Sequence, residues 1–411
     1  MTTPVVEVTE SAAALDVVAG VDTHADSHHV AVLDMAGRKL GDRQIPTTTA
    51  GYESLRSYLE SFGHVRLVGI EGTSSYGAGL ARYLRSHHVD IREIIRPRRS
   101  QRRRGKSDPI DAYAAAQQAL AEPESLPQAK TGDGIVEQIR VLLTVRRSAV
   151  KARVAVVRQI KSLLVTASEA IKTQWDRSSE HQAIAKLAAT RPGAPTASVD
   201  AATGHALRRL ARRHRYLTGE IEELDEDLRE LVATAAPAMI ATKGYGVIAT
   251  ATLLVTAGSN PERLRSEASF AALCGASPIP ASSGKTHRFR LNRGGDRQAN
   301  WALHQIALVR LSSDQRTKQY SARLRANGKS TKDVLRCLKR AIAREAFHLL
   351  VHPAPVLATD DLRDLRHRRG VTLVRAAKSI GAEPSRLSEL ERGRRPNAEL
   401  ATAYRAWLTA A

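Results

Sequence analysis

Residues 20–34 read GVDTHADSHHVAVLD, in which Asp22 stands between two apolar runs. The valines on either side of it are typical of buried β-strands. We therefore expect strands over residues 17–24 and 28–34. A bare carboxylate is unfavourable inside a core, so we expect the Asp22 side chain to point out of the sheet into a functional site.

The segments that follow predict an α/β fold for this part of the chain. We expect a third strand over 38–45, then a helix in AGYESLRSYLESF, a strand in RLVGIE, a helix in GAGLARYLRSH, a strand in DIREII and a helix opened by Asp108. Three strands followed by alternating helices and strands resemble the ribonuclease H-like fold. An actin-like ATPase core begins in a similar way and remains an alternative.

Composition indicates a large anionic partner. The 411 residues include 63 Lys and Arg against 42 Asp and Glu, a net charge of +21, which favours nucleic acid. No apolar stretch approaches the ~20 residues of a spanning helix, and the N-terminus lacks the pattern of a signal peptide. The only cysteines, Cys274 and Cys337, are too few for a disulfide scaffold or a zinc cluster. We expect a cytoplasmic protein without a membrane partner.

Beyond the α/β part the chain is predicted to be helical. A basic helix is expected from about Ile135 to Leu164, the stretch TRPGAPTASVDAATGH predicts a flexible loop, and a second helix carries a heptad seam. The seam consists of Leu210, His214, Leu217, Ile221, Leu224, Leu228 and Leu231. Such a seam predicts a coiled coil and a homo-oligomer, either a dimer or a tetramer.

Several domains are therefore expected. They are a flexible N-terminus (1–15), an α/β domain (16–125), a helical coiled-coil region (126–238), a helical domain (239–350) and a small helical tail (360–411).

Three further acidic residues occur where this fold would gather them. Glu71 ends an apolar strand, and Asp108 and Asp111 stand in KSDPIDA. With Asp108 as N-cap and Pro109 as first helical residue, Asp111 falls on the same face of the helix. Converging carboxylates repel one another unless hard cations such as Mg²⁺ neutralise them. Two ions would clamp the attacking and leaving oxygens of a phosphodiester, and Mn²⁺ is the alternative metal. Any one of these acids alone is more often a structural residue.

A basic run directly precedes this helix. Residues 96–106, RPRRSQRRRGK, carry seven positive charges and no negative one. A charge run is often only a solvated loop, but beside a metal site it would attract phosphates. The candidate nucleic-acid contacts are Arg98, Arg99, Arg102, Arg103, Arg104 and Lys106.

The order of GVDTH, GIEGTSSYG and KSDPIDA resembles the DEDD transposases of insertion-sequence family 110, and the resemblance extends over roughly residues 17–348. It implies an N-terminal domain similar to the RuvC Holliday-junction resolvase, with Asp22, Glu71, Asp108 and Asp111 as the catalytic, metal-binding quartet. It also implies that the protein acts on element ends and target DNA and binds a non-coding bridge RNA that pairs with both.

The polar stretch ASPIPASSGKTHRFRLNRGGDRQ is similar to the C-terminal patch of that family, where a serine before a glycine is the nucleophile. Ser283 matches best, and Ser282 is the adjacent alternative. Without the resemblance this loop reads as an ordinary polar turn. Arginine stands at position 293 where lysine is usual, which favours phosphate contact over proton transfer. The expected phosphate contacts are Lys285, Arg288, Arg290, Arg293 and Arg297.

The last fifty or so residues resemble a lambda-repressor-like helix-turn-helix. Ser385 and Arg386 lie on the predicted recognition helix. A protein-contact module of the same shape is the alternative, because fold does not fix function.

These features together predict a DNA transposase or recombinase that uses Mg²⁺, a serine nucleophile and a bridge RNA. A RuvC-like structure-selective endonuclease without a covalent intermediate would keep the four acids and would not need Ser283. An ATPase would need phosphate and adenosine motifs that the sequence lacks. A transcription factor would leave the acids without a role.

Overall fold

The computed structural model describes residues 15–94, 107–173, 175, 179–281, 284, 289–353, 359, 361–393 and 397–410. The chain divides into two compact units, Met1–Gly132 with Gly258–Arg263, and Asp133–Ala257 with Leu264–Ala411. The expected flexible N-terminus, residues 1–15, lies outside the described residues apart from Leu15.

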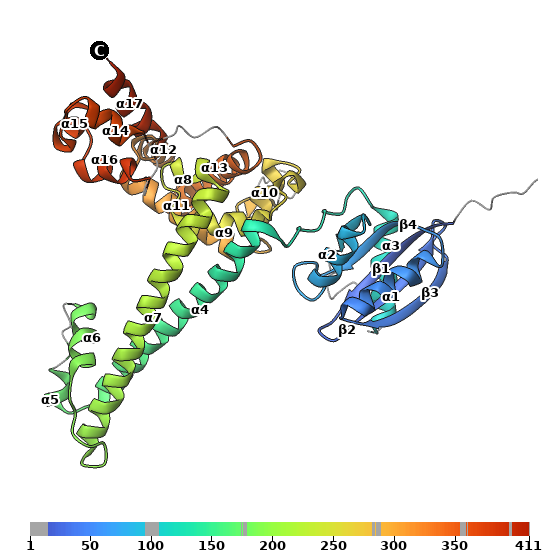
Figure 1. Ribbon diagram of the computed structural model, residues 1–411, viewed down its shortest axis with the longest axis horizontal. Coiled ribbons are helices and arrows are strands. Elements are labelled where there is room, and N and C mark those ends of the chain that lie inside the picture. The colour runs from blue at the N-terminus through green and yellow to red at the C-terminus, as the bar shows by residue number, and fades with distance from the viewer. Residues whose placement is uncertain are drawn as a thin grey trace, which may run out of the picture. The chain divides into compact units, whose positions relative to one another are not determined.

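The first unit is built on one five-stranded sheet, drawn in blue in Figure 1. Its strands are β1 (Asp16–Thr23), β2 (Ser27–Asp34), β3 (Lys39–Pro46), β4 (His64–Glu71) and β5 (Ile91–Ile94). They lie in the order β3-β2-β1-β4-β5; β2 is antiparallel to β1 and β3, and β4 is parallel to β1 and β5. This arrangement confirms the predicted ribonuclease H-like fold.

Three helices cover the two faces of the sheet: α1 (Thr49–Glu60), α2 (Ala78–Ser86) and α3 (Asp108–Ala121). One face of β1, β2 and β4 packs on leucines of α1 and α2, while the opposite face packs on alanines of α3. Because β1 is buried on both faces, its sequence is almost continuously apolar.

Gly20 allows α3 to pack very close to β1. A Cβ atom at Gly20 would lie 2.1 Å from the backbone nitrogen of Ala116, a distance that no side chain tolerates. β1 carries Asp22 and α3 begins with Asp108 and Asp111, so this close approach sets the separation of the acidic side chains.

The predicted N-cap of α3 is wrong by one residue. Ser107 is the cap, in an extended conformation, and Asp108 is already helical, with Pro109 after it. The Ser107 carbonyl accepts a hydrogen bond from the Asp111 amide at 3.1 Å. No side chain caps this helix end in the part that the structure describes. The Asp108 carboxylate is therefore free of a capping role.

The second unit begins with two long antiparallel helices, α4 (Gly134–Thr166) and α7 (Val199–Ala235), which lie side by side in Figure 1. Leu217 of α7 shares a core with Ile160 of α4, and Leu228 shares another with Leu143. The heptad seam therefore packs within the chain, and it is not by itself a reason to expect a second copy. The short helices α5 (Glu169–Lys172) and α6 (Glu180–Ala189) lie between α4 and α7 in the chain.

The stretch TRPGAPTASVDAATGH is only in part the predicted loop. Helix α7 begins at Val199, because the Ser198 hydroxyl caps it by accepting a hydrogen bond from the Ala201 amide at 3.0 Å. Asp200 in the first turn adds a favourable interaction with the helix dipole.

A compact group of helices follows α7. Its helices are α8 (Pro237–Ala241), α9 (Val247–Ala257), α10 (Glu267–Leu273), α11 (Arg297–Ser313), α12 (Gln315–Ala326) and α13 (Thr331–Val351). A two-stranded hairpin, β6 (Ile279–Pro280) and β7 (Phe289–Arg290), lies between α10 and α11. The turn η2 (Pro261–Arg263) belongs to the first unit.

The tail forms the predicted helix-turn-helix. Its helices are α14 (Leu362–Arg368), α15 (Leu373–Ser379), α16 (Pro384–Glu391) and α17 (Ala398–Thr409). Leu387, Leu390 and Tyr404 form the centre of its small core. Across the described residues of the chain, no helix combines the length and apolar character needed to cross a membrane.

Candidate functional site

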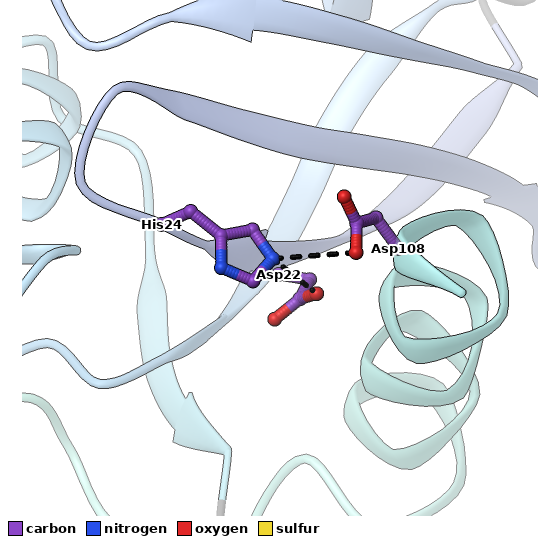
Figure 2. A group of neighbouring side chains, drawn as sticks. All are labelled: Asp22, His24 and Asp108. Atoms are coloured by element: carbon purple, nitrogen blue, oxygen red, sulfur yellow. Dashed lines mark ion pairs between the residues drawn. The ribbon is translucent and has the colours of Figure 1, made fainter. Parts of the chain in front are cut away.

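Two carboxylates and one imidazole meet at the end of β1, as Figure 2 shows. His24 Nε2 lies 3.2 Å from Asp22 Oδ2 and 3.3 Å from Asp108 Oδ1. A carboxylate oxygen of Asp22, a carboxylate oxygen of Asp108 and a ring nitrogen of His24 all lie within 4.8 Å of one another. The Asp22 side chain is 3% exposed, whereas the Asp108 side chain is 45% exposed, so the group is buried on the β1 side and open on the α3 side.

Several polar atoms of this group lack hydrogen bonds. Within the described residues, Asp22 Oδ2, His24 Nε2 and Asp111 Oδ2 are buried and have no hydrogen-bond partner. Asp22 Oδ2 and His24 Nε2 nevertheless lie 3.2 Å apart and form an ion pair with each other. Leaving such atoms unpaired costs about 1–3 kcal/mol each. Carboxylate oxygens are the ligands of hard divalent cations, so a cation bound here would satisfy the two unpaired oxygens.

The electrostatics of Asp22 agree with this interpretation. Burial raises the pKa of the Asp22 carboxyl above its ordinary value, His24 opposes this shift, and the charges of Asp111 and Asp108 raise the pKa further. The ionised form of Asp22 is thus unfavourable unless positive charge is close. A divalent cation would supply that charge.

Glu71 ends the neighbouring strand. Val21 of β1 pairs with Ile70 of β4, so Asp22 and Glu71 are the next residues of two adjacent parallel strands. The Thr23 hydroxyl donates to the Glu71 backbone carbonyl at 2.8 Å and ties the two strand ends together. The Glu71 side chain is half-buried and does not belong to the group of three with His24.

We call Asp22, Glu71, Asp108 and Asp111 the acidic quartet. The structure brings Asp22 and Asp108 together around His24, and Asp111 acts on Asp22 through its charge. Sequence reasoning missed His24. Its signal was its place in GVDTH, two residues after Asp22 and directly after the end of β1.

The basic run before α3 lies outside the described residues. This applies to Arg98, Arg99, Arg102, Arg103, Arg104 and Lys106.

The second predicted site is described only at its base. Ser282, Ser283, Lys285 and Arg288 lie outside the described residues.

The loop between α10 and α11, which contains the two serines, is called the serine loop here; its ends come together through close glycine packing. A Cβ atom at Gly295 would lie 2.2 Å from the backbone nitrogen of Gly275. Beyond this point Ile279 pairs with Arg290 and Pro280 pairs with Phe289.

Polar side chains fix this base. Asn300 Nδ2 donates to the carbonyls of Cys274 at 3.0 Å and Gly275 at 3.1 Å, and Lys339 Nζ donates to Asn300 Oδ1 at 2.9 Å. Asp296 caps α11 and accepts a hydrogen bond from the Thr256 hydroxyl at 2.9 Å. The serine loop thus starts and ends on a rigid platform.

Three of the predicted phosphate contacts are described. Arg290 lies on β7, Arg293 follows it and Arg297 is the first residue of α11. All three side chains are exposed, and none makes an ion pair with another described residue. They remain available to an anion.

The tail presents Ser385 and Arg386 on α16, where Arg386 makes an ion pair with Glu389 at 3.2 Å. A buried group fixes this helix. Arg366 donates to both Glu391 oxygens at 2.7 and 2.9 Å, and the Tyr404 hydroxyl donates to Glu391 at 2.7 Å.

Three family models match the chain. A model described as "Transposase" matches residues 19–168, one described as "Transposase IS116/IS110/IS902 family" matches residues 236–322, and one described as "Helix-turn-helix domain" matches residues 360–406. The chain is also similar to an uncharacterized 43.6 kDa protein of insertion element IS110 from Streptomyces coelicolor. The two are 24% identical over 375 residues, which cover 79% of this chain and 91% of that protein. The first model spans the acidic quartet and the second spans the serine loop.

Proposed function

The chain belongs to the IS110 family of transposases, and on this premise we propose that it cuts and rejoins DNA with two sets of residues, the acidic quartet and the serine loop. One observation carries the proposal: the carboxylates of Asp22 and Asp108 meet around His24 within 4.8 Å of one another, and a buried oxygen of Asp111 has no hydrogen-bond partner among the described residues. A purely structural pair of carboxylates would have acquired donors.

The proposed metal is Mg²⁺, bound as two ions, with Mn²⁺ as the alternative. Asp22, Asp108 and Asp111 would hold it, and Glu71 would complete the set from the adjacent strand. When bound, such ions neutralise the charge of a phosphodiester and stabilise both the attacking and the leaving oxygen. Imidazole is not a preferred ligand of Mg²⁺. The proposed role of His24 is therefore to hold Asp22 and Asp108 in position, since it contacts both.

Ser283 is the proposed nucleophile, with Ser282 as the adjacent alternative. Its hydroxyl oxygen would attack phosphorus, the bond from phosphorus to one DNA oxygen would break, and that oxygen would take up the proton. The strand would stay joined to the serine until a DNA hydroxyl attacked the same phosphorus and released it. Arg290, Arg293 and Arg297, whose charges are free among the described residues, would stabilise the phosphate.

The proposed partners are element ends and target DNA, a non-coding bridge RNA, and further copies of the chain in a dimer or tetramer. Family resemblance supports the RNA and the oligomer. The acidic quartet would lie in a domain of residues 16–125, the serine loop in one of residues 239–350, and a helical region of residues 126–238 would connect them. The tail, residues 360–411, would add DNA contacts through Ser385 and Arg386.

A single assay tests the proposal. Purified protein is incubated with Mg²⁺, candidate RNA and element-end DNA, and denaturing gels then reveal protein–DNA adducts and joined products. We expect both from the wild type, and neither from Ser283→Ala or Asp22→Ala. Cleavage by Ser283→Ala without any adduct would instead establish the structure-selective endonuclease.

A further inference from the structure

A cavity lies beside the base of the serine loop. Its volume is about 420 Å³, which is within the range of sites that hold a small organic molecule. Its walls are residues 275–278 and 289–292 at the loop base, Tyr320 of α12 and residues of the segment 329–344. Its basic lining residues are Arg290, Lys329, Arg336, Lys339, Arg340 and Arg344. We call it the basic cavity.

The basic cavity has an excess of positive charge. Arg336, Arg340 and Arg344 recur every four residues and therefore form one stripe along α13. Asp333 is the only acidic residue among the described lining residues. It is already engaged, because it accepts hydrogen bonds from the Ser330 hydroxyl at 2.6 Å and from Arg336 at 2.7 Å.

Arg340 has a guanidinium nitrogen that is shielded from solvent. Its Nη1 atom is buried and has no hydrogen-bond partner in the described part of the chain. The neighbouring Lys339 is also affected, because burial lowers the pKa of its ammonium group and the charge of Arg336 lowers it further. A buried guanidinium nitrogen without a partner, in a lining with more cations than anions, favours a bound anion.

The apolar side chains at the cavity refine the class of ligand. Phe289 is 69% exposed and Leu291 is 52% exposed, on either side of Arg290. An aromatic face next to cations is the combination that binds an unpaired nucleotide, with the base stacked and the phosphate held by arginine. The cavity is also larger than one phosphate group requires.

We propose that the basic cavity binds one nucleotide of an unpaired nucleic-acid strand, with its phosphate on Arg340 and Arg344 and its base against Phe289. This inference rests on the proposed function for its ligand, because the strand would be one that passes the serine loop. Its test measures binding without cleavage, so that the two can fail separately.

The test uses the full chain and fluorescence anisotropy with short labelled single-stranded DNA and RNA of the same sequence, over a series of salt concentrations. The double variant Arg340→Gln/Arg344→Gln removes two charges from the cavity. The matched control, Lys318→Gln/Arg325→Gln, removes two exposed charges from α12 that do not line the cavity.

We expect the cavity variant to raise Kd by roughly tenfold or more. The slope of log Kd against log salt should fall by about one for each phosphate that the variant no longer binds. The control should keep the wild-type slope of log Kd against log salt. Arg340→Lys should have nearly the same slope as the wild type, because the charge at this position is kept. If the cavity variant binds DNA, RNA or both more weakly, the proposal that the cavity binds a nucleotide is supported. The nucleic acid whose binding is weakened is then the ligand.

A cavity variant that matches the control with both DNA and RNA overturns the proposal. Thermal melting verifies that each variant is folded. If the double variant does not fold, the single variant Arg344→Gln, at an exposed position, replaces it in the binding measurement. Asp22→Ala should bind DNA and RNA like the wild type. The binding measurement therefore tests the cavity even if the proposed catalytic chemistry is wrong.

Discussion

Replacing Gly20 with alanine should damage the proposed metal site without removing any candidate ligand. Gly20 contacts the backbone of α3, which carries Asp108 and Asp111, and it lies two residues before Asp22 on β1. The added Cβ atom would lie 2.1 Å from Ala116 N, and the contacted atoms belong to a helix backbone that cannot rotate away.

The size of the effect follows from this distance. Ordinary van der Waals contact begins at 3.4 Å, so α3 would have to withdraw from β1 by just over 1 Å. Overpacking of this kind costs about 1–3 kcal/mol of stability. A displacement of about 1 Å at reacting groups costs about a hundredfold in rate. We therefore expect a folded protein with roughly a hundredfold less strand exchange.

The assay measures the melting temperature with Mg²⁺ and with a chelator, together with strand exchange. Wild-type protein should melt higher with Mg²⁺, because a ligand of the native state stabilises it, and Gly20→Ala should lose most of that increase. Gly41→Ala on β3 is the matched control, since its Cβ atom would meet the end of the Tyr58 side chain, which can move. Equal losses in both variants, or a full Mg²⁺ response in Gly20→Ala, would refute the reasoning.

Four further outcomes are expected. Alanine at any member of the acidic quartet should abolish strand exchange in a folded protein, as circular dichroism and the joining assay can test; full recombination would exclude the metal site. Ser283→Ala should bind nucleic acid but form no adduct, and Ser282→Ala should have a milder effect. If Ser282→Ala were inactive and Ser283→Ala active, Ser282 would be the nucleophile instead. Deleting residues 356–411 should weaken or redirect DNA binding but preserve catalysis on supplied substrates; an inactive, folded truncation would contradict this. Burial raises the pKa of Glu391, but hydrogen bonds from Arg366 and Tyr404 outweigh this effect and the pKa is lowered. The tail should therefore lose stability as the pH falls through that pKa. Glu391→Gln should have a lower melting temperature at neutral pH, and it should not show this loss of stability in acid.

The sheet could be predicted because its signal is local. Strand β1 and the second half of β2 are apolar at nearly every position because both of their faces are covered, and turn residues marked the following elements. The positions of two of the acids have a similarly local basis, because Asp22 and Glu71 directly follow the paired residues Val21 and Ile70 on adjacent parallel strands.

Partners of an apolar stripe could not be predicted in the same way. The heptad seam of α7 is indeed used in packing, but periodicity states only that a face is covered and not by what. Leu217 packs on α4 of the same chain, so the covering surface comes from residues about sixty positions away. Likewise, the spacing of Arg336, Arg340 and Arg344 is visible in the sequence, whereas their position beside the serine loop depends on tertiary packing.

The acidic quartet and the basic cavity both gather like charges, negative in the quartet and positive in the cavity. In the acidic quartet, burial and the charges of the neighbouring carboxylates raise the pKa of Asp22, and the basic cavity holds a buried guanidinium nitrogen without an acceptor among the described residues. Each arrangement destabilises the free protein, since unpaired buried polar groups cost free energy. In the proposed function, metal ions would supply cations to the carboxylates and a nucleic-acid strand would supply phosphates to the arginines. We therefore expect metal and nucleic acid each to raise the melting temperature. Asp22→Ala should remove only the response to metal, and Arg340→Gln/Arg344→Gln should reduce only the response to the strand. If each variant weakened both responses equally, the two sites would not be separate.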